Sequence, residues 1–277
     1  MELDGRTAVV TGAAGGIGLG IAKAALDRGM QVMIADLDGA RAEEQAAALA
    51  GDGGRIEARG CDVRDLGAVE ALRDDALRTF GRVDLVANNA GVGLARPFEE
   101  CRPADWDLLL DVNVRGVTNG VRAFLPHFIE QGWGHVTATA SLSGLVADPD
   151  LAVYNLTKFA VVGLLEALAL EMRRDHPGVT ASVLCPGPVA TDLMDTSAKV
   201  LADAGSGSDD HNEAVGEYLA RGMHPDDVGR LAVDGIAAGR FWLLPHPDLT
   251  FELLEARMAG MRDGGRLADI AEEWTDQ

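Results

Sequence analysis

The sequence predicts an α/β fold, a doubly wound parallel sheet of seven strands with helices on both faces. Short apolar runs alternate with longer segments of helical periodicity along the 277 residues. The runs are apolar throughout, as expected of parallel strands that are covered on both faces. Right-handed crossovers would then give the doubly wound arrangement. No repeat or linker divides the chain, so we expect a single domain over residues 1–277.

Each apolar run is assigned to a strand and each periodic segment to a helix. The expected strands are residues 7–11, 31–36, 56–61, 83–88, 135–139, 180–184 and 241–244. The expected helices are residues 16–28, 39–50, 65–80, 103–130 and 151–174, a helix that begins near residue 225, and one over 249–261. This alternation of strand and helix is typical of consecutive βαβ units.

One long segment, about residues 186–225, lacks a clear periodicity. Its centre at 203–212 (DAGSGSDDHN) is polar and rich in turn-forming residues. Irregular segments of this length in a compact domain usually cover a binding site. We therefore expect a substrate loop here, with a mobile surface insertion without function as the alternative.

Composition and charge exclude several classes of function. The chain has 44 acidic and 24 basic residues and a net charge of −20, so it would repel nucleic acid and anionic lipid. The three cysteines form no CxxC pair and the six histidines no HxxxH pair, so no metal site is expected. The first residues lack a signal-peptide pattern, and the longest apolar stretch, 159–172, is too short to span a bilayer. We expect a cytoplasmic protein with neither a membrane nor a nucleic acid partner.

A glycine-rich turn connects the first expected strand to the first helix. In TGAAGGIG, Gly12, Gly16 and Gly18 fit the spacing GxxxGxG, and through Gly15 the turn also fits GxxGxxG. Glycines let the backbone approach a pyrophosphate, and the helix N-terminus supplies N–H donors. The turn therefore predicts a nucleotide site in a Rossmann-type fold, with a plain strand-to-helix corner as the alternative.

Asp36 ends the second expected strand, 18 residues after Gly18. A carboxylate there can accept hydrogen bonds from both adenosine ribose hydroxyls and would repel a 2′-phosphate. Gly15 and Leu37 stand where a phosphate-binding cation is usual, and Arg41 is expected to point to solvent. The sequence thus favours NAD over NADP. Capping of the next helix is an alternative role that Asp36 could combine with the first.

Two more turns follow the third and fourth expected strands. Asp62 comes directly after the third strand, where it could bond the adenine amino group. The turn at 88–91 (NNAG) ends the fourth strand. Ligands bind at this carboxyl edge in open α/β sheets, so both turns fit the same nucleotide site.

A tyrosine and a lysine at helical spacing suggest acid–base chemistry. Tyr154 and Lys158 share one face of the expected helix 151–174. The ammonium would favour the phenolate and lower the pKa of Tyr154 from about 10. Such a tyrosine suits the interconversion of an alcohol and a ketone. Ser141, or less favourably Ser143, could bond the same substrate oxygen, and Asn113 is a polar residue on an apolar face. A surface pair and a satisfied core amide are the alternatives.

Taken together, these motifs resemble the short-chain dehydrogenase/reductase family. TGAAGGIG, NNAG, Asn113, Ser141, Tyr154-x-x-x-Lys158 and residues 186–191 (PGPVAT) occur in the order and spacing of that family. The match runs from residue 5 to about 245. The resemblance implies NAD(P)-dependent oxidoreduction with Tyr154 as general acid and base.

The resemblance also implies roles for individual residues. It assigns Lys158 to the nicotinamide ribose and to tuning Tyr154, Ser141 to the substrate oxygen, and Asn113 to a water-linked proton relay. Motifs and resemblance together give as cofactor contacts Gly12, Gly16, Ile17, Gly18, Asp36, Asp62, Val63, Asn89, Ala90, Gly91, Tyr154, Lys158, Pro186, Gly187, Val189 and Thr191. Val189 and Thr191 would hold the carboxamide.

The resemblance further implies self-association. Family members are usually homotetramers, in which the helix that carries Tyr154 packs against its mate. Ala160, Gly163 and Ala167 would permit a close approach of two such helices. We therefore expect a homotetramer, or a homodimer.

The C-terminal part departs from the commonest family pattern. After FWLLPHP at 241–247, the chain continues in an extension of about 246–277 that ends in an acidic tail. This ending resembles members that act on bulky, often aromatic or terpenoid secondary alcohols. The expected apolar wall of the substrate site is Leu94, Phe98, Leu142, Leu145, Val146, Leu151, Met194, Tyr218 and Met223.

The sequence therefore favours an NAD-dependent dehydrogenase or ketoreductase for an apolar alcohol or ketone. An epimerase or dehydratase of the extended relatives is one alternative, although those enzymes usually need a larger C-terminal region. A non-catalytic NAD sensor is the other, although such proteins typically lose the tyrosine or the lysine.

Overall fold

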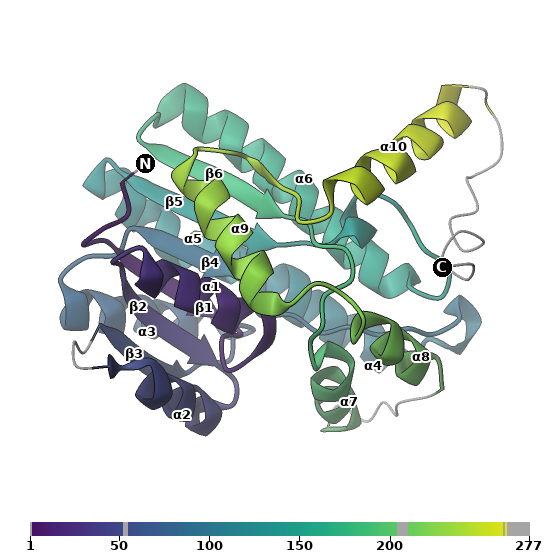
Figure 1. Ribbon diagram of the computed structural model, residues 1–277, viewed down its shortest axis with the longest axis horizontal. Coiled ribbons are helices and arrows are strands. Elements are labelled where there is room, and N and C mark those ends of the chain that lie inside the picture. The colour runs from purple at the N-terminus through teal and green to yellow at the C-terminus, as the bar shows by residue number, and fades with distance from the viewer. Residues whose placement is uncertain (1, 52–54, 204–209, 263, 265–277) are drawn as a thin grey trace.

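The computed structural model describes residues 2–51, 55–203, 210–262 and 264. Its strands form one parallel sheet in the order β3-β2-β1-β4-β5-β6-β7 (Figure 1). They are β1 (Thr7–Thr11), β2 (Gln31–Asp36), β3 (Ile56–Gly60), β4 (Leu85–Asn88), β5 (Gly134–Thr139), β6 (Val179–Leu184) and β7 (Trp242–Leu243). The strand order reverses between β1 and β4, which creates a crevice at their carboxyl ends. The predicted doubly wound seven-stranded sheet is confirmed.

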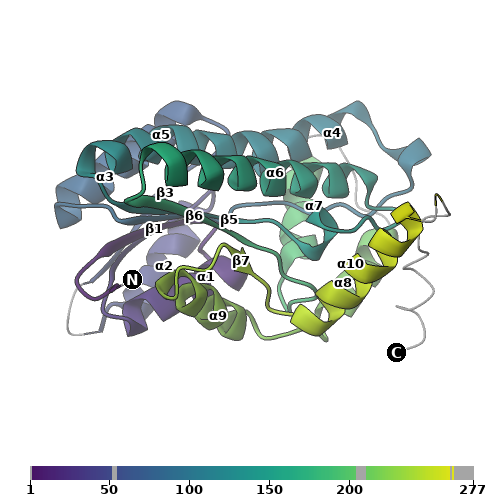
Figure 2. The ribbon, with the colours of Figure 1, turned by 90° about the horizontal axis from the view of Figure 1, so that it is seen from above.

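Helices cover both faces of the sheet. They are α1 (Gly16–Asp27), α2 (Gly39–Leu49), α3 (Leu66–Phe80), α4 (Pro103–Leu109), α5 (Gly116–Gln131), α6 (Ala152–Asp175), α7 (Leu193–Asp203), α8 (Asp210–Leu219), α9 (Pro225–Ala237) and α10 (Pro247–Arg262). Figure 2 shows α3, α5 and α6 on one face and α1, α2 and α9 on the other.

Each face has its own apolar core because consecutive strand residues point to opposite sides. In β1, Val9 belongs to the core under α3, α5 and α6, whereas Val10 belongs to the core under α1, α2 and α9. Phe124 and Phe128 of α5 are fully buried in the first core. Truncation of such a phenylalanine typically costs about 3–5 kcal/mol, so these side chains hold α5 to the sheet.

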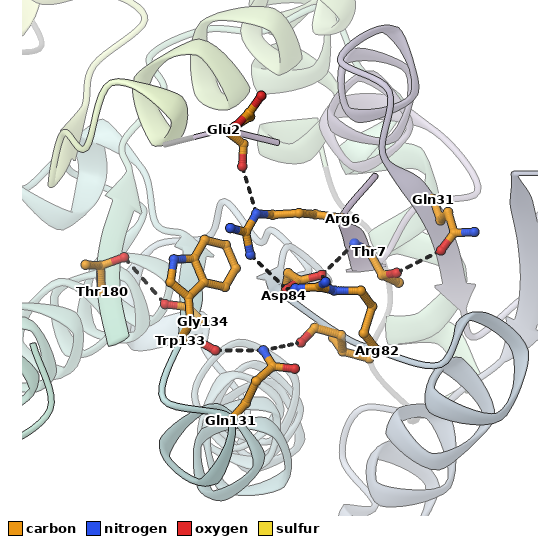
Figure 3. A network of polar contacts seen from close by, with 11 residues as sticks. Glu2, Arg6, Thr7, Gln31, Arg82, Asp84, Gln131, Trp133, Gly134 and Thr180 are labelled. Atoms are coloured by element: carbon orange, nitrogen blue, oxygen red, sulfur yellow. Dashed lines mark hydrogen bonds and ion pairs between the residues drawn. The ribbon is translucent and has the colours of Figure 1, made fainter. Parts of the chain in front are cut away.

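A buried carboxylate organises the amino edge of the sheet, opposite the crevice (Figure 3). Asp84 is fully buried and accepts hydrogen bonds from the Thr7 backbone N–H (2.9 Å), Arg6 Nη1 (3.2 Å) and Arg82 Nε (2.6 Å). The Arg6 guanidinium also lies 3.5 Å from the centre of the Trp133 ring. Because a buried charge is tolerated only when it is paired, this network ties the start of β1 to the start of β4.

A polar seam joins β5 and β6 inside the protein. His135 is buried, and its Nδ1 and Nε2 lie 2.8 Å from the hydroxyls of Thr180 and Ser182. The Ser182 hydroxyl in turn donates to Thr137 Oγ1 at 3.0 Å. Burial lowers the pKa of His135 from 6.5 to about 3, so the imidazole is neutral at physiological pH.

Because His135 is buried and neutral, we expect the free energy of unfolding to fall as the pH drops below about 6.5. The unfolded chain takes up a proton on His135 near pH 6.5, whereas the folded chain does so only near pH 3. The stability that this histidine contributes is therefore complete above pH 6.5 and is lost progressively toward pH 3. We expect a loss of about 2 kcal/mol between pH 7.5 and 5. Urea unfolding across this range measures it, and His135→Gln should show a flatter pH dependence. Equal slopes for the two proteins would contradict the prediction.

Two helices pack backbone to backbone where α9 crosses α1. A Cβ atom added to Gly20 would overlap the carbonyl oxygen of Pro225, and one added to Gly229 would overlap the carbonyl carbon of Gly20. The first residue of α9 is thus fixed against α1, whose N-terminus starts at the glycine-rich turn.

The segment after β6 is more regular than expected. The prediction of an irregular stretch at 186–225 is wrong over α7 and α8. The buried residues Met194, Ser197 and Leu201 recur at intervals of three and four residues and give α7 one buried face. The polar run at 203–212 concealed this pattern. Residues 204–209 of this segment and 265–277 of the C-terminal extension lie outside the described residues.

Two other boundaries also differ from the prediction. The expected helix 103–130 is split into α4 and α5 by a π-helical turn, Leu110–Arg115. The last strand, β7, has only two residues. Among the described residues, α6 is long and apolar enough to cross a bilayer by length and composition alone. It packs against β6 and buries Lys158, as a core helix of the sheet does.

Candidate active site

A cavity of about 870 Å³ opens at the carboxyl edge of the sheet, at the point where the strand order reverses between β1 and β4. Its wall consists of the turns after β1 to β6, the start of α6, and residues of α7 and α8. Every cofactor contact proposed from the sequence lines this cavity except Gly18, and every proposed catalytic residue lines it except Asn113. The sequence motifs, distant along the chain, therefore meet at one site.

The glycines of the first turn have distinct physical functions. Gly12 and Gly16 have φ values of +62° and +54°, which favour glycine. A Cβ at Gly12 would also lie 2.6 Å from the Cα of Ala90. Gly18 lies behind the cavity wall, where a side chain would overlap the Gly12 carbonyl oxygen. Gly18 thus lets α1 approach the turn and supports the site from outside.

The start of α1 fits the phosphates of a dinucleotide. Gly15 is the N-cap residue, and no side chain of the described residues caps the helix there. Gly15, Gly16 and Ile17 all line the cavity. Uncapped N–H groups and the helix dipole attract an anion, and the lack of side chains lets it come close.

Asn89 fixes the turn after β4 to the turn after β1. Its Nδ2 donates to the carbonyl oxygens of Thr11 (3.1 Å) and Gly12 (3.0 Å), while its Oδ1 accepts a bond from Thr139 Oγ1 (3.0 Å). Asn89 therefore connects the carboxyl ends of β1, β4 and β5, which form the floor of the crevice.

Asp36 lies at the cavity with its carboxylate held by two backbone donors. Ala14 N–H donates to Oδ2 at 3.0 Å, and Asp38 N–H donates to Oδ1 at 3.1 Å. The N-cap of α2 is Asp38, whose side chain accepts the Arg41 N–H at 3.0 Å. The alternative role of Asp36 as helix cap is therefore wrong, and its carboxylate remains directed at the cavity edge.

Arg41 is 43% exposed, in line with its predicted direction toward solvent, yet it also reaches the cavity. Its guanidinium folds back over the glycine-rich turn, where Nη2 would be 3.2 Å from a Cβ at Gly15. Nη2 also lies 3.8 Å from the Asp192 carboxylate, and both residues line the cavity. The flexible side chain reaches back because the turn offers an open glycine surface and an acidic partner on the far side.

Asp62 lines the cavity with its carboxylate paired to Arg64. Its carboxylate accepts Nε (2.9 Å) and Nη2 (2.6 Å) of Arg64, and hydrogen bonding to Arg64 lowers its pKa. Both oxygens are thus engaged by a cation two residues away. The sequence did not predict this ion pair, and a bond from Asp62 to the adenine amino group stays a prediction.

Tyr154, Ser141 and Lys158 meet in the centre of the cavity wall. The side chains of Tyr154 and Ser141 both line the cavity, and Ser141 lies close enough to lower the pKa of Tyr154. Lys158 Nζ donates to the Thr139 carbonyl oxygen at 3.0 Å and lies 5.4 Å from the centre of the Tyr154 ring. An alcohol oxygen placed here would meet both hydroxyls at once, the geometry that general acid–base catalysis requires.

Burial is the main cause of the pKa shifts of Tyr154 and Lys158. It raises the pKa of Tyr154 to about 12, with the charge of Asp148 adding to the rise and the Ser141 side chain opposing it. Burial also lowers the pKa of Lys158 to about 8. The prediction that Lys158 lowers the tyrosine pKa is therefore wrong for this structure, because desolvation dominates and the ammonium is directed to Thr139.

Asn113 lies in the π-helical turn between α4 and α5. It exchanges two hydrogen bonds of 2.9 Å with the backbone of Val92, and its Nδ2 lies 3.1 Å from Thr157 Oγ1. A Cβ at Gly91 would be 3.2 Å from Asn113 Oδ1 and 3.5 Å from Lys158 Nζ. Asn113 thus fixes the turn after β4 against α6, and glycine leaves space between its amide and Lys158.

Comparisons with known proteins agree with this geometry. Residues 6–201 match the family model described as short chain dehydrogenase. A structure of a short chain dehydrogenase/reductase from Burkholderia phymatum in complex with NAD has a TM-score of 0.92 and 32% identity, and the match covers 97% of this chain and 98% of that one.

The chain belongs to the short-chain dehydrogenase family.

Two further relatives carry an activity in their names. The D-threitol dehydrogenase of Mycolicibacterium smegmatis is 38% identical over 69% of this chain and 73% of its own length. The D-beta-hydroxybutyrate dehydrogenase of Cupriavidus necator is 34% identical over 83% of this chain and 90% of its own length. This short-chain dehydrogenase is accordingly an oxidoreductase, and its family binds a nicotinamide cofactor.

The apolar wall of this short-chain dehydrogenase was only partly predicted. Leu94, Leu142, Leu151, Met194 and Tyr218 line the cavity as expected. Phe98 is 65% exposed and packs on Trp106 outside, while Leu145 and Val146 are buried beneath the wall. Met223 pairs with Val189 in a short β-bridge and does not line the cavity. The apolar character of these residues is evident from the sequence, but the direction of each side chain depends on the loop backbone.

Sequence reasoning also missed several polar residues at the site. Ser197 Oγ of α7 accepts the Gly93 N–H, and Asn212 Oδ1 of α8 accepts the Ala95 N–H, each at 2.8 Å. These bonds hold α7 and α8 against the turn after β4. Asp148 lines the cavity from the loop between β5 and α6. No motif or spacing distinguishes these three from other loop or helix residues.

Proposed function

We propose that the protein interconverts a secondary alcohol and a ketone with NAD, using Tyr154 as the general acid and base. The observation that supports this is that Tyr154 and Ser141 line the same cavity as the uncapped start of α1. A reacting oxygen at the two hydroxyls would lie in the same crevice as a dinucleotide on the glycine-rich turn.

The bound nicotinamide supplies the hydride acceptor for alcohol oxidation and the hydride donor for ketone reduction. Ser141 positions the substrate oxygen. In reduction the Tyr154 phenol gives its proton to the carbonyl oxygen. In oxidation Tyr154 must first lose that proton to water, and its phenolate then accepts the alcohol proton. Because the pKa of Tyr154 is about 12, the phenol is protonated at neutral pH and ready to act as the acid. Asn113 and Lys158 border the space through which we propose that water relays the proton.

The proposed substrate has an apolar body. Leu94, Leu142 and Leu151 line the cavity beside the two hydroxyls, and Met194 and Tyr218 line it from α7 and α8. Burial of such a side chain against an apolar ligand is favourable at about 25 cal/mol per Å². A bulky alcohol or ketone would therefore gain affinity from this wall.

We also propose a homotetramer or homodimer in a reducing, cytoplasmic environment. On α6, Leu156 and Leu170 are about half exposed, and Gly163 has open space above it, which favours packing against a second copy. The three cysteines are free thiols, as is usual in reducing compartments. Light scattering of the purified protein measures the assembly directly.

Lys158→Ala is expected to lower both kcat and the affinity for NAD, each by about 10-fold or more. An ammonium that bonds the nicotinamide ribose contributes a charge-assisted hydrogen bond, worth about 1.5–3 kcal/mol. Stopped-flow or equilibrium fluorescence of NADH binding measures the affinity independently of turnover. Lys199→Ala is a matched control, because Lys199 lies on the α7 side of the cavity. Unchanged NADH affinity in Lys158→Ala would remove the ribose role.

A spectrophotometric screen tests the proposal as a whole. NAD reduction at 340 nm is followed with steroid, terpenoid, aryl and sugar secondary alcohols, and NADH oxidation with the matching ketones. We expect turnover with at least one apolar class, and a loss of at least about 100-fold in Tyr154→Phe. Near-wild-type turnover in this variant would show that another group transfers the proton.

A further inference from the structure

The carboxylate of Asp148 lies in the part of the cavity where we expect the substrate, and most of the wall around it is apolar. Asp148 belongs to the loop between β5 and α6 and lines the cavity six residues before Tyr154. Its negative charge raises the pKa of both Tyr154 and Tyr218, so it lies within electrostatic reach of the two phenols. It therefore borders the space that a substrate on Tyr154 would fill.

The loop holds this carboxylate at a fixed position relative to the reacting oxygen. Ser143 Oγ donates to Asp148 Oδ2 at 3.1 Å, and the Ser143 N–H donates to Ser141 Oγ at 3.1 Å. The Asp148 carbonyl oxygen accepts Asn155 Nδ2 at 2.8 Å, which ties the loop to the first turn of α6. Ser141, Ser143 and Asp148 thus form one connected row along the cavity.

The Asp148 carboxylate has no cationic partner among the described residues, although a buried carboxylate is normally paired. Within the described residues the Asp148 carboxylate forms no ion pair, and the Ser143 hydroxyl is its one side-chain donor. Burial raises its pKa, which reflects the cost of charge in this part of the cavity. A donor group on a ligand would offset that cost, whereas a second carboxylate would increase it.

We infer that Asp148 binds a hydrogen-bond donor of the substrate, a second hydroxyl or an amino group near the reacting carbinol. The substrate class is then an apolar secondary alcohol that carries such a donor, or the corresponding ketone, and hydroxy acids are disfavoured. This inference rests on the proposed function and assigns Asp148 to substrate selection. It separates this chain from its relative named for D-beta-hydroxybutyrate, whose substrate is an anion.

A series of four aryl alcohols with the same carbinol tests the inference. They are 1-phenylethane-1,2-diol, 2-amino-1-phenylethanol, 1-phenylpropan-1-ol and mandelate, which place a hydroxyl, an ammonium, a methyl group or a carboxylate beside the reacting carbon. We expect kcat/KM for the diol or the amino alcohol to exceed that for 1-phenylpropan-1-ol by at least about 10-fold, which corresponds to about 1.4 kcal/mol. Mandelate should be the poorest of the four.

Two substitutions separate the charge from the hydrogen bond. In Asp148→Ala, the preference for the donor-bearing alcohols should fall about 10-fold through KM. Any change in kcat, through Tyr154, should be shared by all four alcohols. Asp148→Asn should keep part of the diol preference, lose the preference for the amino alcohol and improve mandelate. Affinity of the diol for the enzyme–NADH complex, from NADH fluorescence, gives a second readout, and thermal unfolding checks that each variant is folded.

The outcomes distinguish the inference from the proposed function. If the wild type oxidises the diol and 1-phenylpropan-1-ol equally, or if Asp148→Ala keeps the wild-type preference, the inference is overturned and the proposed function stands. If neither these alcohols nor the matching ketones are turned over, the result counts against the proposed function, and the inference falls with it.

Discussion

Tyr154→Phe is expected to lower kcat by at least about 100-fold while NADH affinity changes little. The substitution removes one hydroxyl, the group that lines the cavity with Ser141 and that would exchange the proton with the substrate. General acid–base catalysis contributes about 10²–10⁴-fold, so the loss should reach at least the lower end of this range. Steady-state kinetics and NADH fluorescence titration measure the two quantities separately.

The second tyrosine of the chain provides a matched control. Tyr218 also lines the cavity, but it belongs to α8 and not to α6. Tyr218→Phe removes the same hydroxyl from the same cavity and should lower kcat by less than about 10-fold. Similar losses in the two variants would mean that the cavity needs both hydroxyls for another reason, and near-wild-type turnover in Tyr154→Phe would refute the mechanism.

The wild-type enzyme is expected to prefer NAD over NADP by about 100-fold or more in kcat/KM, with Asp36 as the main cause. The carboxylate is already held by the N–H groups of Ala14 and Asp38 and can accept the ribose hydroxyls without reorganisation. Each such charge-assisted bond is worth about 1.5–3 kcal/mol, and NADP would replace them with a phosphate dianion beside a carboxylate. Asp36→Ala should lower the efficiency with NAD and remove most of the discrimination.

Substitutions of two neighbouring residues, Arg41 and Asp38, give further tests of the role of Asp36. Arg41 lies over the glycine-rich turn and is the cation best placed to offset a 2′-phosphate, so Arg41→Ala should increase the preference for NAD. Asp38 lines the same cavity but caps α2, so Asp38→Asn should change stability more than discrimination. An intact preference in Asp36→Ala, or an NADP preference in the wild type, would show that another group selects the cofactor.

The sequence predicted the sheet well because most strands are short, largely apolar runs between turns. It missed α7 and α8 because the polar residues between them concealed the three- and four-residue spacing of Met194, Ser197 and Leu201. Helix and strand periodicities are local properties, whereas the break of 103–130 at the π-helical turn depends on Asn113 bonding to Val92, far from it in sequence.

The cofactor side of the site could be predicted because it depends mainly on backbone, which glycines and strand ends reveal. The positions of flexible side chains could not be predicted from the sequence. Arg41 reaches back to the turn and Arg64 folds onto Asp62 because of partners that only the folded chain provides. The spacing of Tyr154 and Lys158 correctly placed both at one cavity, but the pKa of Tyr154 depends on desolvation, which no spacing encodes.

The backbone contact between α1 and α9 has a consequence for large-scale mutagenesis. Neither Gly20 nor Gly229 has room for a single methyl group, because each faces the main chain of the other helix. A library scored for turnover alone would rank these two glycines as intolerant alongside Tyr154, although neither lines the cavity. Protein abundance scored in the same library would separate them: substitutions at the glycines should deplete the folded enzyme, whereas Tyr154→Phe should leave its amount unchanged.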